Sequence, residues 1–178
     1  RLFWRTIAVP DPTKKYAYQY LVDVKIKISD PYSEVILDPW NDQYISTRLD
    51  ATLPKHPGKK ADGVVAVLEG PKAKEKYEWQ VTDFKRPLPK DLVIYELLVR
   101  DFYSTQSLQA VINKLDYLKT LGINAIELMP VTEFDGNDSW GYNPNHFFAY
   151  DKAYGKRNLY KQFVDACHEQ GIAVIIDM

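Results

Sequence analysis

Apolar residues follow two different patterns along the chain, and the pattern changes near residue 85. Before this point they alternate with polar residues, first in residues 16–20 and then in residues 21–28, LVDVKIKI. Alternation at every second position is typical of half-buried antiparallel strands. Residues 64–68 and 77–81 are further strand candidates. These segments predict a small and incomplete β-sandwich over residues 1–85.

Beyond residue 85 the apolar residues form continuous runs or recur at helical spacing. Residues 92–99, LVIYELLV, are nearly all apolar, as expected of a strand buried on both faces. Residues 108–121 have apolar side chains at every third or fourth position and predict a helix that stops at Gly122. A second helix is predicted over residues 158–170, with Asn158 as its N-cap.

A helix–glycine–strand unit occurs twice in this second region, at residues 115–130 and 163–178. In each copy a glycine, Gly122 or Gly171, is followed by isoleucine and an apolar strand that reaches a carboxylate. The order strand–helix–strand–helix–strand predicts a parallel sheet with right-handed crossovers. Such sheets place their chemistry just past the carboxyl ends of the strands. Residues 84–91, FKRPLPKD, are interpreted as the linker between the two regions.

The turn after the first parallel strand distinguishes between two folds. A dinucleotide-binding fold requires a G-x-G-x-x-G turn at this position. Residues 100–107, RDFYSTQS, contain no glycine, and the sequence has no phosphate-binding G-x-x-x-x-G-K loop. A (β/α)8 TIM barrel needs neither motif, so the sequence favours the first three βα units of such a barrel.

The connection after the second parallel strand, residues 130–157, is far longer than the usual length of about two to six residues. It combines aromatic rings with amides and carboxylates, which suits pyranose rings because their C–H faces stack while their hydroxyls form hydrogen bonds. We expect Phe147, Phe148 and Tyr154 to pack this loop onto the sheet. His146 is expected to form hydrogen bonds at the rim, because no second histidine lies near it in sequence for a metal site.

Composition and charge exclude several classes of function. The formal net charge of −1 gives no electrostatic case for binding nucleic acid or an anionic membrane. No apolar run is long enough to span a bilayer. The single cysteine, Cys167, cannot form an internal disulfide and is expected to be a small buried side chain. Extracellular, periplasmic and cytoplasmic locations all stay open.

Four segments carry a resemblance to a known family: YELLVRDF, LDYLKTLGINAIELMPV, SWGYNPNHFFAYDKAYG and GIAVIIDM. Together they resemble the alpha-amylase family of glycoside hydrolases, family thirteen, over about residues 91–178. The earlier region, with its motif DPYSEVILDPW, resembles the immunoglobulin-like N-terminal domain of branching enzymes and isoamylases. The resemblance implies an incomplete immunoglobulin-like sandwich at residues 1–85, a candidate glucan-binding domain. Residues 86–178 are then the start of a catalytic (β/α)8 barrel, truncated after strand three.

The resemblance also implies roles for four residues. The pair Gly141-Tyr142 matches the family motif whose tyrosine stacks on the sugar in the cleavage subsite, so Tyr142 inherits that role. Trp140 and Asn143 are its neighbours and are candidate substrate contacts at the rim. Asp177 matches the aspartate at the end of strand three, which supports the active site in the family and is not the nucleophile.

The catalytic carboxyl groups are expected to lie outside this chain. Retaining glycosidases use two of them about 5–5.5 Å apart, one as nucleophile and one as acid/base. In the family these follow strands four and five, beyond Met178, so we assign no catalytic residue and expect an inactive fragment. Glu96 and Glu127, inside strands, are expected to have structural partners. Glu133 and Asp135 are expected to be solvated or to support the loop.

The sequence thus predicts part of a retaining glycoside hydrolase or transglycosidase acting on starch-like or glycogen-like α-glucans. The resemblance indicates no certain cofactor and no metal ligand here, although calcium is common in complete family members. An alternative is a non-catalytic amylase-like or carbohydrate-binding protein, which turnover by the complete protein would distinguish. A third interpretation is an unrelated α/β domain with a structural loop. The bond type and the choice between hydrolysis and transfer stay open.

Overall fold

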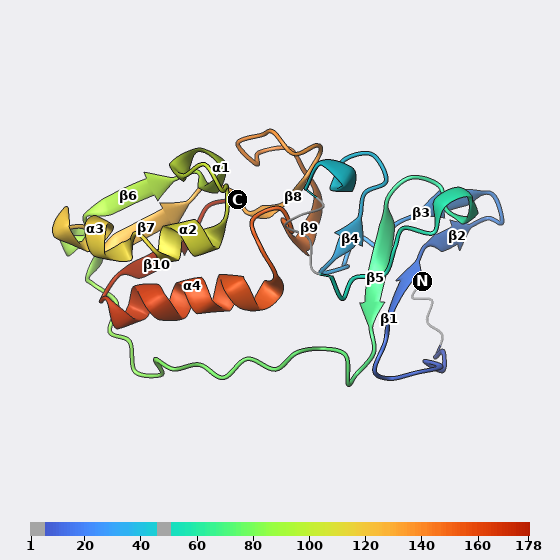
Figure 1. Cartoon of the computed structure of the whole chain (residues 1–178), viewed down its shortest axis with the longest axis horizontal. Helices are drawn as coiled ribbons and strands as arrows, with labels where there is room; N and C mark the ends of the chain where they lie inside the picture. Colours follow the sequence, from blue (N-terminus) through green and yellow to red (C-terminus); the bar gives the residue numbers. More distant parts are fainter. Residues whose placement is uncertain (1–5, 46–50) are drawn as a thin grey trace.

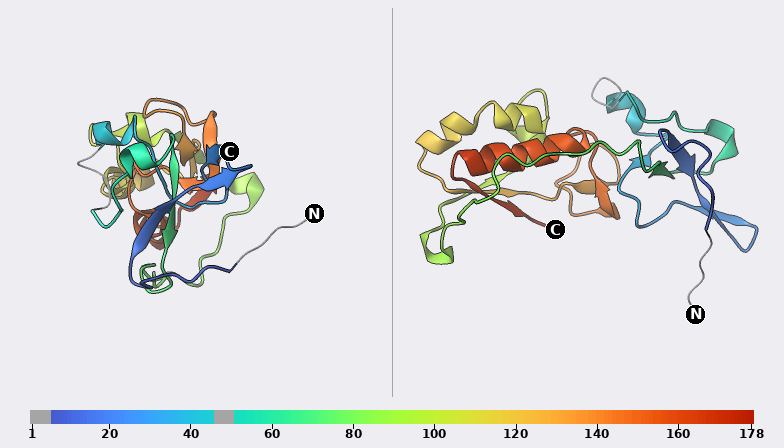
Figure 2. Two further views of the ribbon diagram at one scale, coloured as in Figure 1. Left: turned by 90° about the vertical axis from the view of Figure 1, so that its right-hand side faces the viewer. Right: turned by 90° about the horizontal axis from the view of Figure 1, so that it is seen from below.

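The computed structural model describes residues 6–45 and 51–178. The N-terminal strands form one part of the molecule, and a parallel sheet with its helices forms the other (Figure 1). A hairpin of two strands, β8 Thr132–Phe134 and β9 Pro144–Tyr150, lies between these two parts (Figure 1). The C-terminal end of the chain lies near the middle of the molecule (Figures 1 and 2). The three single-turn helices are η1 Asp42–Ile45, η2 Gly58–Lys60 and η3 Pro89–Asp91.

An antiparallel sheet of three strands forms the centre of the N-terminal part. Strand β5, Val65–Glu69, lies in the middle and pairs with β1, Lys15–Tyr18, and with β4, Ile36–Leu37. Its small core consists of Val35, Leu37, Val65 and Val67. The predicted strands at residues 16–20 and 64–68 are therefore confirmed in type, with boundaries shifted by one or two residues.

The alternating run at residues 21–28 is a hairpin rather than one half-buried strand. Strands β2, Tyr20–Val22, and β3, Ile26–Ile28, pair antiparallel, and all six of their residues are exposed. The chain reverses at Asp23 and Val24, which have positive φ angles of 51° and 59°. The hairpin pairs only with itself among the described residues. A sandwich of two facing sheets is therefore not confirmed.

The segment at residues 77–81 is an extended strap along helix α4, Arg157–Glu169, and its prediction as a strand was wrong (Figure 1). The buried carboxylate of Asp165 holds this strap by accepting three hydrogen bonds, from Tyr77 Oη at 2.6 Å, Gln80 N at 3.0 Å and Val81 N at 3.1 Å. Farther along, the ring of Phe84 stacks on His168 with centroids 3.9 Å apart. The start of the predicted linker is thus packed on the helix.

Three parallel strands form the second sheet, and their spatial order is their order in the chain. They are β6 Ile94–Leu97, β7 Ala125–Leu128 and β10 Ala173–Ile176. The helices lie on one face of this sheet (Figure 2). There Leu97, Ile126 and Leu128 pack with apolar residues of the helices, among them Leu118 and Phe163. This arrangement confirms the predicted parallel β-α-β-α-β order.

The predicted helix at residues 108–121 is two short helices. The four α-helices are α1 Val99–Phe102, α2 Leu108–Ile112, α3 Leu115–Thr120 and α4 Arg157–Glu169. The chain turns at Asn113, and Lys114 N bonds to Val111 O at 2.9 Å. Lys156 occupies the N-cap position of α4, so the assignment of that role to Asn158 was wrong. Gly122 and Gly171 have φ angles of 82° and 72° and end α3 and α4 as predicted.

The prediction that residues 92–99 are buried on both faces was wrong. Ile94 and Glu96 are exposed, whereas Leu97 is buried against the helices. The physical reason is that the described helices cover only one face of the sheet, so the other face of β6 is open. Cys167 is fully buried, as expected. In the part of the chain that the structure describes, no helix has the length and apolarity of a membrane span.

The long connection after β7 contains two strands of its own. Strand β8, Thr132–Phe134, pairs antiparallel with β9, Pro144–Tyr150, and the register shifts on both sides of Glu133. Residues 135–143 join the two strands and form the loop tip of this hairpin. The hairpin brings the loop tip to the carboxyl ends of the parallel strands, where sheets of this type bind ligands.

Candidate functional site

The candidate site lies where the loop tip meets the carboxyl end of β10. Tyr142 Oη donates a hydrogen bond to Asp177 Oδ2 at 2.5 Å. Asp177 follows the last residue of β10, and its backbone N–H bonds to Leu128 O of β7 at 3.0 Å. The parallel pairing of β10 with β7 therefore fixes the position of Asp177, and the hydrogen bond to Asp177 fixes the orientation of Tyr142. Two residues predicted separately from the sequence are brought into direct contact.

The Tyr142 ring is accessible while its hydroxyl is engaged. The side chain is 53% exposed. Its hydrogen bond to Asp177, its partial burial and the negative charges of Asp177, Glu96 and Glu127 raise the pKa of Tyr142 to about 12. The phenol therefore stays protonated near neutral pH and remains a hydrogen-bond donor. An exposed aromatic face with a fixed orientation can stack on a flat apolar surface of a ligand.

Both carboxylate oxygens of Asp177 accept hydrogen bonds in this arrangement. Oδ2 accepts from Tyr142, and Oδ1 accepts from the backbone N–H of Met178 at 2.7 Å. Glu96 and Glu127 lie directly opposite each other on β6 and β7. Within the described residues neither side chain forms a hydrogen bond or an ion pair, so the structural partners expected for them are not found. Their effect on Tyr142 is through their charge.

The loop tip has an internal scaffold that aims Tyr142. Gly141 has a φ angle of 94°, and a Cβ atom there would lie 2.4 Å from Pro130 O. Ser139 Oγ donates to Asn143 Oδ1 and accepts from Gly141 N at 3.0 Å. Asn143 is thus bonded inside the loop. Trp140, at 63% exposed, projects into solvent beside Tyr142 and is open to a ligand.

Sequence reasoning missed Arg100, which ties the loop tip to the first parallel strand. Arg100 lies in α1, immediately after β6, and its guanidinium pairs with Asp138 of the loop tip. It also bonds to Asp101 through Nε at 2.7 Å and Nη2 at 2.9 Å. An arginine just past a parallel strand was a signal in the sequence, but its partner in the long loop could not be identified there.

The other aromatic residues of the hairpin divide into two groups. Tyr154 is buried against Phe134, as predicted. Phe147 and Phe148 are 69% and 60% exposed, so the expectation that they pack the loop onto the sheet was wrong. Strand β9 presents them at the surface. His146 forms hydrogen bonds to Ser29 Oγ at 2.9 Å and Asn145 Oδ1 at 3.0 Å, but it is buried against the N-terminal part rather than placed at the rim.

Glu133 is part of a buried ion cluster that sequence reasoning also missed. Lys152 Nζ pairs with Glu133 Oε1 and lies 2.9 Å from Asp42 Oδ1 of the N-terminal part. Lys152 and Glu133 are both almost fully buried. Glu133 was expected to be solvated or to support the loop, and the burial contradicts solvation. Asp135 is exposed.

Burial gives this cluster a measurable pH dependence. Burial raises the pKa of Glu133 to about 8 against the opposing charge of Lys152, and the charges of Asp151 and Asp42 add to the increase. A carboxyl group with a raised folded-state pKa stabilises the fold below its ordinary pKa of about 4.5, and this stability is lost as pH rises through about 8. We expect the free energy of unfolding, measured with urea at pH 5, 6.5 and 8, to include a contribution from Glu133 that decreases as pH rises.

Glu133→Gln is expected to remove this decrease with pH, because glutamine does not ionise. His146 and His168 have lowered pKa values caused by burial, and they give the opposite trend by adding stability as pH rises towards about 6.5. The difference between wild type and Glu133→Gln isolates the Glu133 contribution. Parallel pH profiles of the two proteins would contradict the assignment.

No cluster of three or more metal-ligating side chains occurs within residues 6–45 and 51–178. The guanidinium of Arg100, which contacts the loop tip, already pairs with Asp101 and Asp138.

Comparison with known proteins gives a family match over half of the chain. The family model for the alpha amylase catalytic domain matches residues 90–178. Malto-oligosyltrehalose trehalohydrolase from Saccharolobus solfataricus is 39% identical over 102 residues, which are 57% of this chain and 18% of that protein. The 1,4-alpha-glucan branching enzyme from Pseudoalteromonas atlantica is 29% identical over 195 residues, covering 98% of this chain and 25% of the enzyme.

Solved structures give the same result for the fold. A candidate alpha amylase of Salmonella typhimurium superposes with a TM-score of 0.67 at 28% identity, covering 91% of this chain and 24% of that one. Pullulanase type I from Bacillus subtilis superposes with a TM-score of 0.63 at 24% identity, over 86% of this chain and 23% of that one. The chain thus spans about a quarter or less of the length of these proteins.

Proposed function

The chain belongs to the alpha-amylase family, and from this we propose that it supplies part of the sugar-binding rim of a glycoside hydrolase or transglycosidase acting on α-glucans. The observation that carries the proposal is the contact between Tyr142 and Asp177 at the carboxyl end of the parallel sheet. It supports the roles inferred for both residues, because the aspartate orients a ring whose face is open to a pyranose.

We propose a separate role in sugar binding for each of these residues of the loop tip. The Tyr142 ring stacks on the C–H face of a glucose unit, and its hydroxyl remains on Asp177, which keeps the ring from rotating away. Trp140 adds a second aromatic surface. Asn143 shapes the tip through Ser139 and can offer its amide to a hydroxyl when the loop binds sugar. All four sequence-inferred residues then serve one ligand.

We assign the retaining chemistry to carboxyl groups other than those described here. A nucleophile and an acid/base must flank the scissile bond about 5–5.5 Å apart. Asp177 is bonded to Tyr142 and Met178, and Glu133 is buried beside Lys152. The chain alone is therefore proposed to bind glucan without cleaving it. Calcium, where it contributes, would be held by groups outside the described residues.

The N-terminal part is proposed to be an immunoglobulin-like domain, residues 1–85, that precedes a (β/α)8 barrel beginning at residue 86. Its three-stranded antiparallel sheet and separate hairpin are consistent with part of a sandwich. The parallel order β6-β7-β10 is consistent with the first strands of a barrel. The superposition on the alpha amylase of Salmonella typhimurium, which covers both parts, supports this division.

Affinity electrophoresis of this chain in gels containing soluble starch tests the proposal. Wild type is expected to be retarded, and Tyr142→Ala is expected to weaken binding about two- to tenfold, because an aromatic contact contributes about 0.5–1.5 kcal/mol. Tyr142→Phe keeps the ring and loses only the bond to Asp177, so it should lie between the two. Turnover of glucan by the full-length protein distinguishes an enzyme from a binding protein.

Tyr117→Ala is the matched control, since Tyr117 is a similarly exposed tyrosine, 56% against 53%, on α3 and away from the loop tip. It should migrate as wild type does. Equal retardation of Tyr142→Ala and wild type would overturn the assignment of Tyr142.

A further inference from the structure

The N-terminal part touches the loop tip directly. Asn137 Nδ2 donates a hydrogen bond to the backbone oxygen of Asn41 at 2.8 Å, a contact between residues far apart in the sequence. We propose that the N-terminal part positions the loop tip for glucan binding and that Asn137 is the positioning residue. This inference rests on the proposed function for its ligand, although the contact itself does not.

The acceptor on the N-terminal side is held rigidly by Asp38. Asp38 Oδ1 accepts from the backbone N–H groups of Trp40 and Asn41, at 2.7 and 3.1 Å, and Oδ2 accepts from Asn41 Nδ2 at 2.7 Å. Asp38 is itself buried and follows β4 directly. The position of the Asn41 carbonyl is therefore set by the antiparallel sheet. This gives the DPW motif of the sequence a structural role.

A second connection lies at the other end of the hairpin. Asp42, next to Asn41, pairs with Lys152 just after β9, and its Oδ2 accepts from Asp38 N at 2.9 Å. One short turn of the N-terminal part thus holds the hairpin at its tip and at its base. Along β9, the ring of Phe148 packs on Tyr32 with centroids 5.1 Å apart. These contacts make a continuous interface.

The loop tip is consequently held from three directions. Asn41 holds Asn137, Arg100 holds Asp138, and Asp177 holds Tyr142. A loop that is already ordered loses less conformational entropy when it binds a ligand. Loss of the Asn41 contact frees the tip on the side of the N-terminal part, while the pairing of β8 and β9 remains. We therefore expect the loop tip to become less ordered and the affinity for glucan to fall, with little change in global stability.

Asn137→Ala and Asn137→Asp test this in the whole chain. The aspartate is nearly isosteric but has no N–H donor. We expect faster hydrogen–deuterium exchange of amides 136–143, a changed 19F resonance of fluorinated Trp140, and about two- to tenfold weaker binding of maltoheptaose, the range expected for one hydrogen bond. The midpoint of urea unfolding should stay close to that of wild type.

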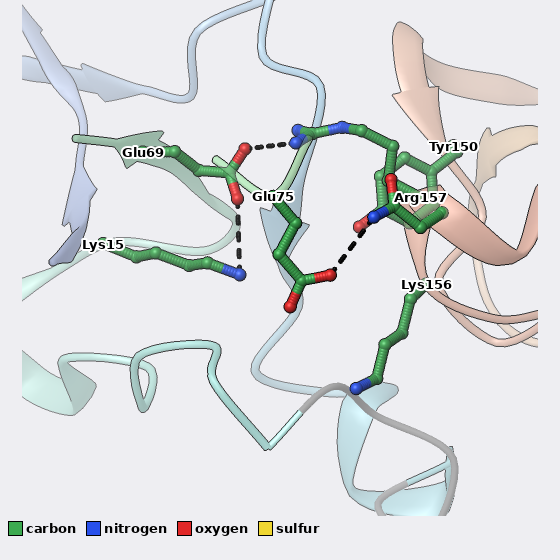
Figure 3. Close-up of a pocket in the computed structure, with 7 residues that line it drawn as sticks. Lys15, Glu69, Glu75, Tyr150, Lys156 and Arg157 are labelled. Atoms are coloured by element: carbon green, nitrogen blue, oxygen red, sulfur yellow. Dashed lines mark hydrogen bonds and ion pairs between the residues drawn. The ribbon is translucent and has the colours of Figure 1, made fainter. Parts of the chain in front are cut away.

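Glu75→Ala is the matched control because it also removes one hydrogen bond between the two parts, at the start of α4. Glu75 Oε2 accepts from Asn158 Nδ2 at 3.2 Å, beside the ion pairs that join Arg157, Glu69 and Lys15 (Figure 3). This contact lies outside the loop tip, so exchange at residues 136–143 and maltoheptaose affinity should both match wild type.

The outcomes separate the inference from the proposed function. Unchanged exchange and an unchanged Trp140 resonance in both Asn137 variants would overturn the inference. A looser tip with wild-type affinity for maltoheptaose would overturn the positioning role. If wild type itself binds no maltoheptaose or starch, the proposed function fails. The exchange data, which need no ligand, then still decide whether Asn137 holds the tip.

Discussion

Replacing Lys152 with methionine is expected to lower the free energy of unfolding by about 3–5 kcal/mol, the usual cost of removing one partner from a buried ion pair. The substitution keeps much of the side-chain volume and removes the charge between Glu133 and Asp42. Burial alone would lower the pKa of Lys152, but the charges of these two carboxylates raise it above its usual value. The lysine is therefore charged, and its loss leaves the carboxyl groups of Glu133 and Asp42 without their cation.

Urea unfolding at pH 5 and pH 8 measures this effect. The loss should be larger at pH 8, because Glu133 can take up a proton at lower pH and relieve the repulsion. Lys74→Met is the control, since it breaks an ion pair with Glu34 whose partners are both about half exposed. Exposed pairs of this kind contribute up to about 1 kcal/mol. Equal losses in the two variants would contradict the importance of burial.

Gly141→Ala is expected to weaken glucan binding at least as much as Tyr142→Ala does and to lower the free energy of unfolding by about 1–3 kcal/mol. The new Cβ atom would lie 2.4 Å from Pro130 O and 2.8 Å from Pro130 Cβ, with φ at 94°. Backbone atoms cannot give way as a flexible side chain can, so the loop tip must move. Because Tyr142 is the next residue, its ring and its bond to Asp177 move as well.

Gly136→Ala separates the two causes of this effect. Gly136 is in the same loop tip and has a similar φ angle of 85°, but no atom lies within 4 Å of the added Cβ. It should therefore show the conformational penalty without the collision, and it should keep most of its retardation in starch gels. Comparable loss of binding in both variants would mean that backbone strain, rather than contact with Pro130, places Tyr142.

The repeated helix–glycine–strand unit predicted the second sheet well. Periodicity and the stops at Gly122 and Gly171 were sufficient to identify β7, α4 and β10 and their parallel order. The contact between Tyr142 and Asp177 was not predicted from the sequence, although it agrees with the general rule that strand ends of a parallel sheet collect functional loops. The predicted features depend on local sequence patterns and on topology, which a single sequence records.

The features that sequence reasoning missed depend on contacts between distant residues. Glu133 looks like an exposed loop residue until Lys152 and Asp42 are placed beside it. The structural role of Arg100 is evident only from its ion pair with Asp138. The carboxylates and the cations were all plain in the sequence, but nothing in their spacing indicated which of them would pair.

Local patterns also misled where exposure decides the outcome. The alternation at residues 21–28 has the period of a half-buried strand, but the turn at Asp23 and Val24 folds it into an exposed hairpin. Phe147 and Phe148 were expected to pack because they are hydrophobic, but both are exposed on β9, and hydrophobicity alone does not determine burial.

The strap along α4 bears on how the protein can be divided. A piece that begins at residue 86, the predicted domain boundary, would remove all three donors from Asp165, a carboxylate only 5% exposed. A hydrogen bond to a charged group contributes about 1.5–3 kcal/mol, and this piece loses three of them. A piece that begins at Tyr77 keeps those donors and the cover that Phe84 gives to His168. The residue where the two parts are joined and the residue where the second folding unit starts are therefore different positions in the sequence.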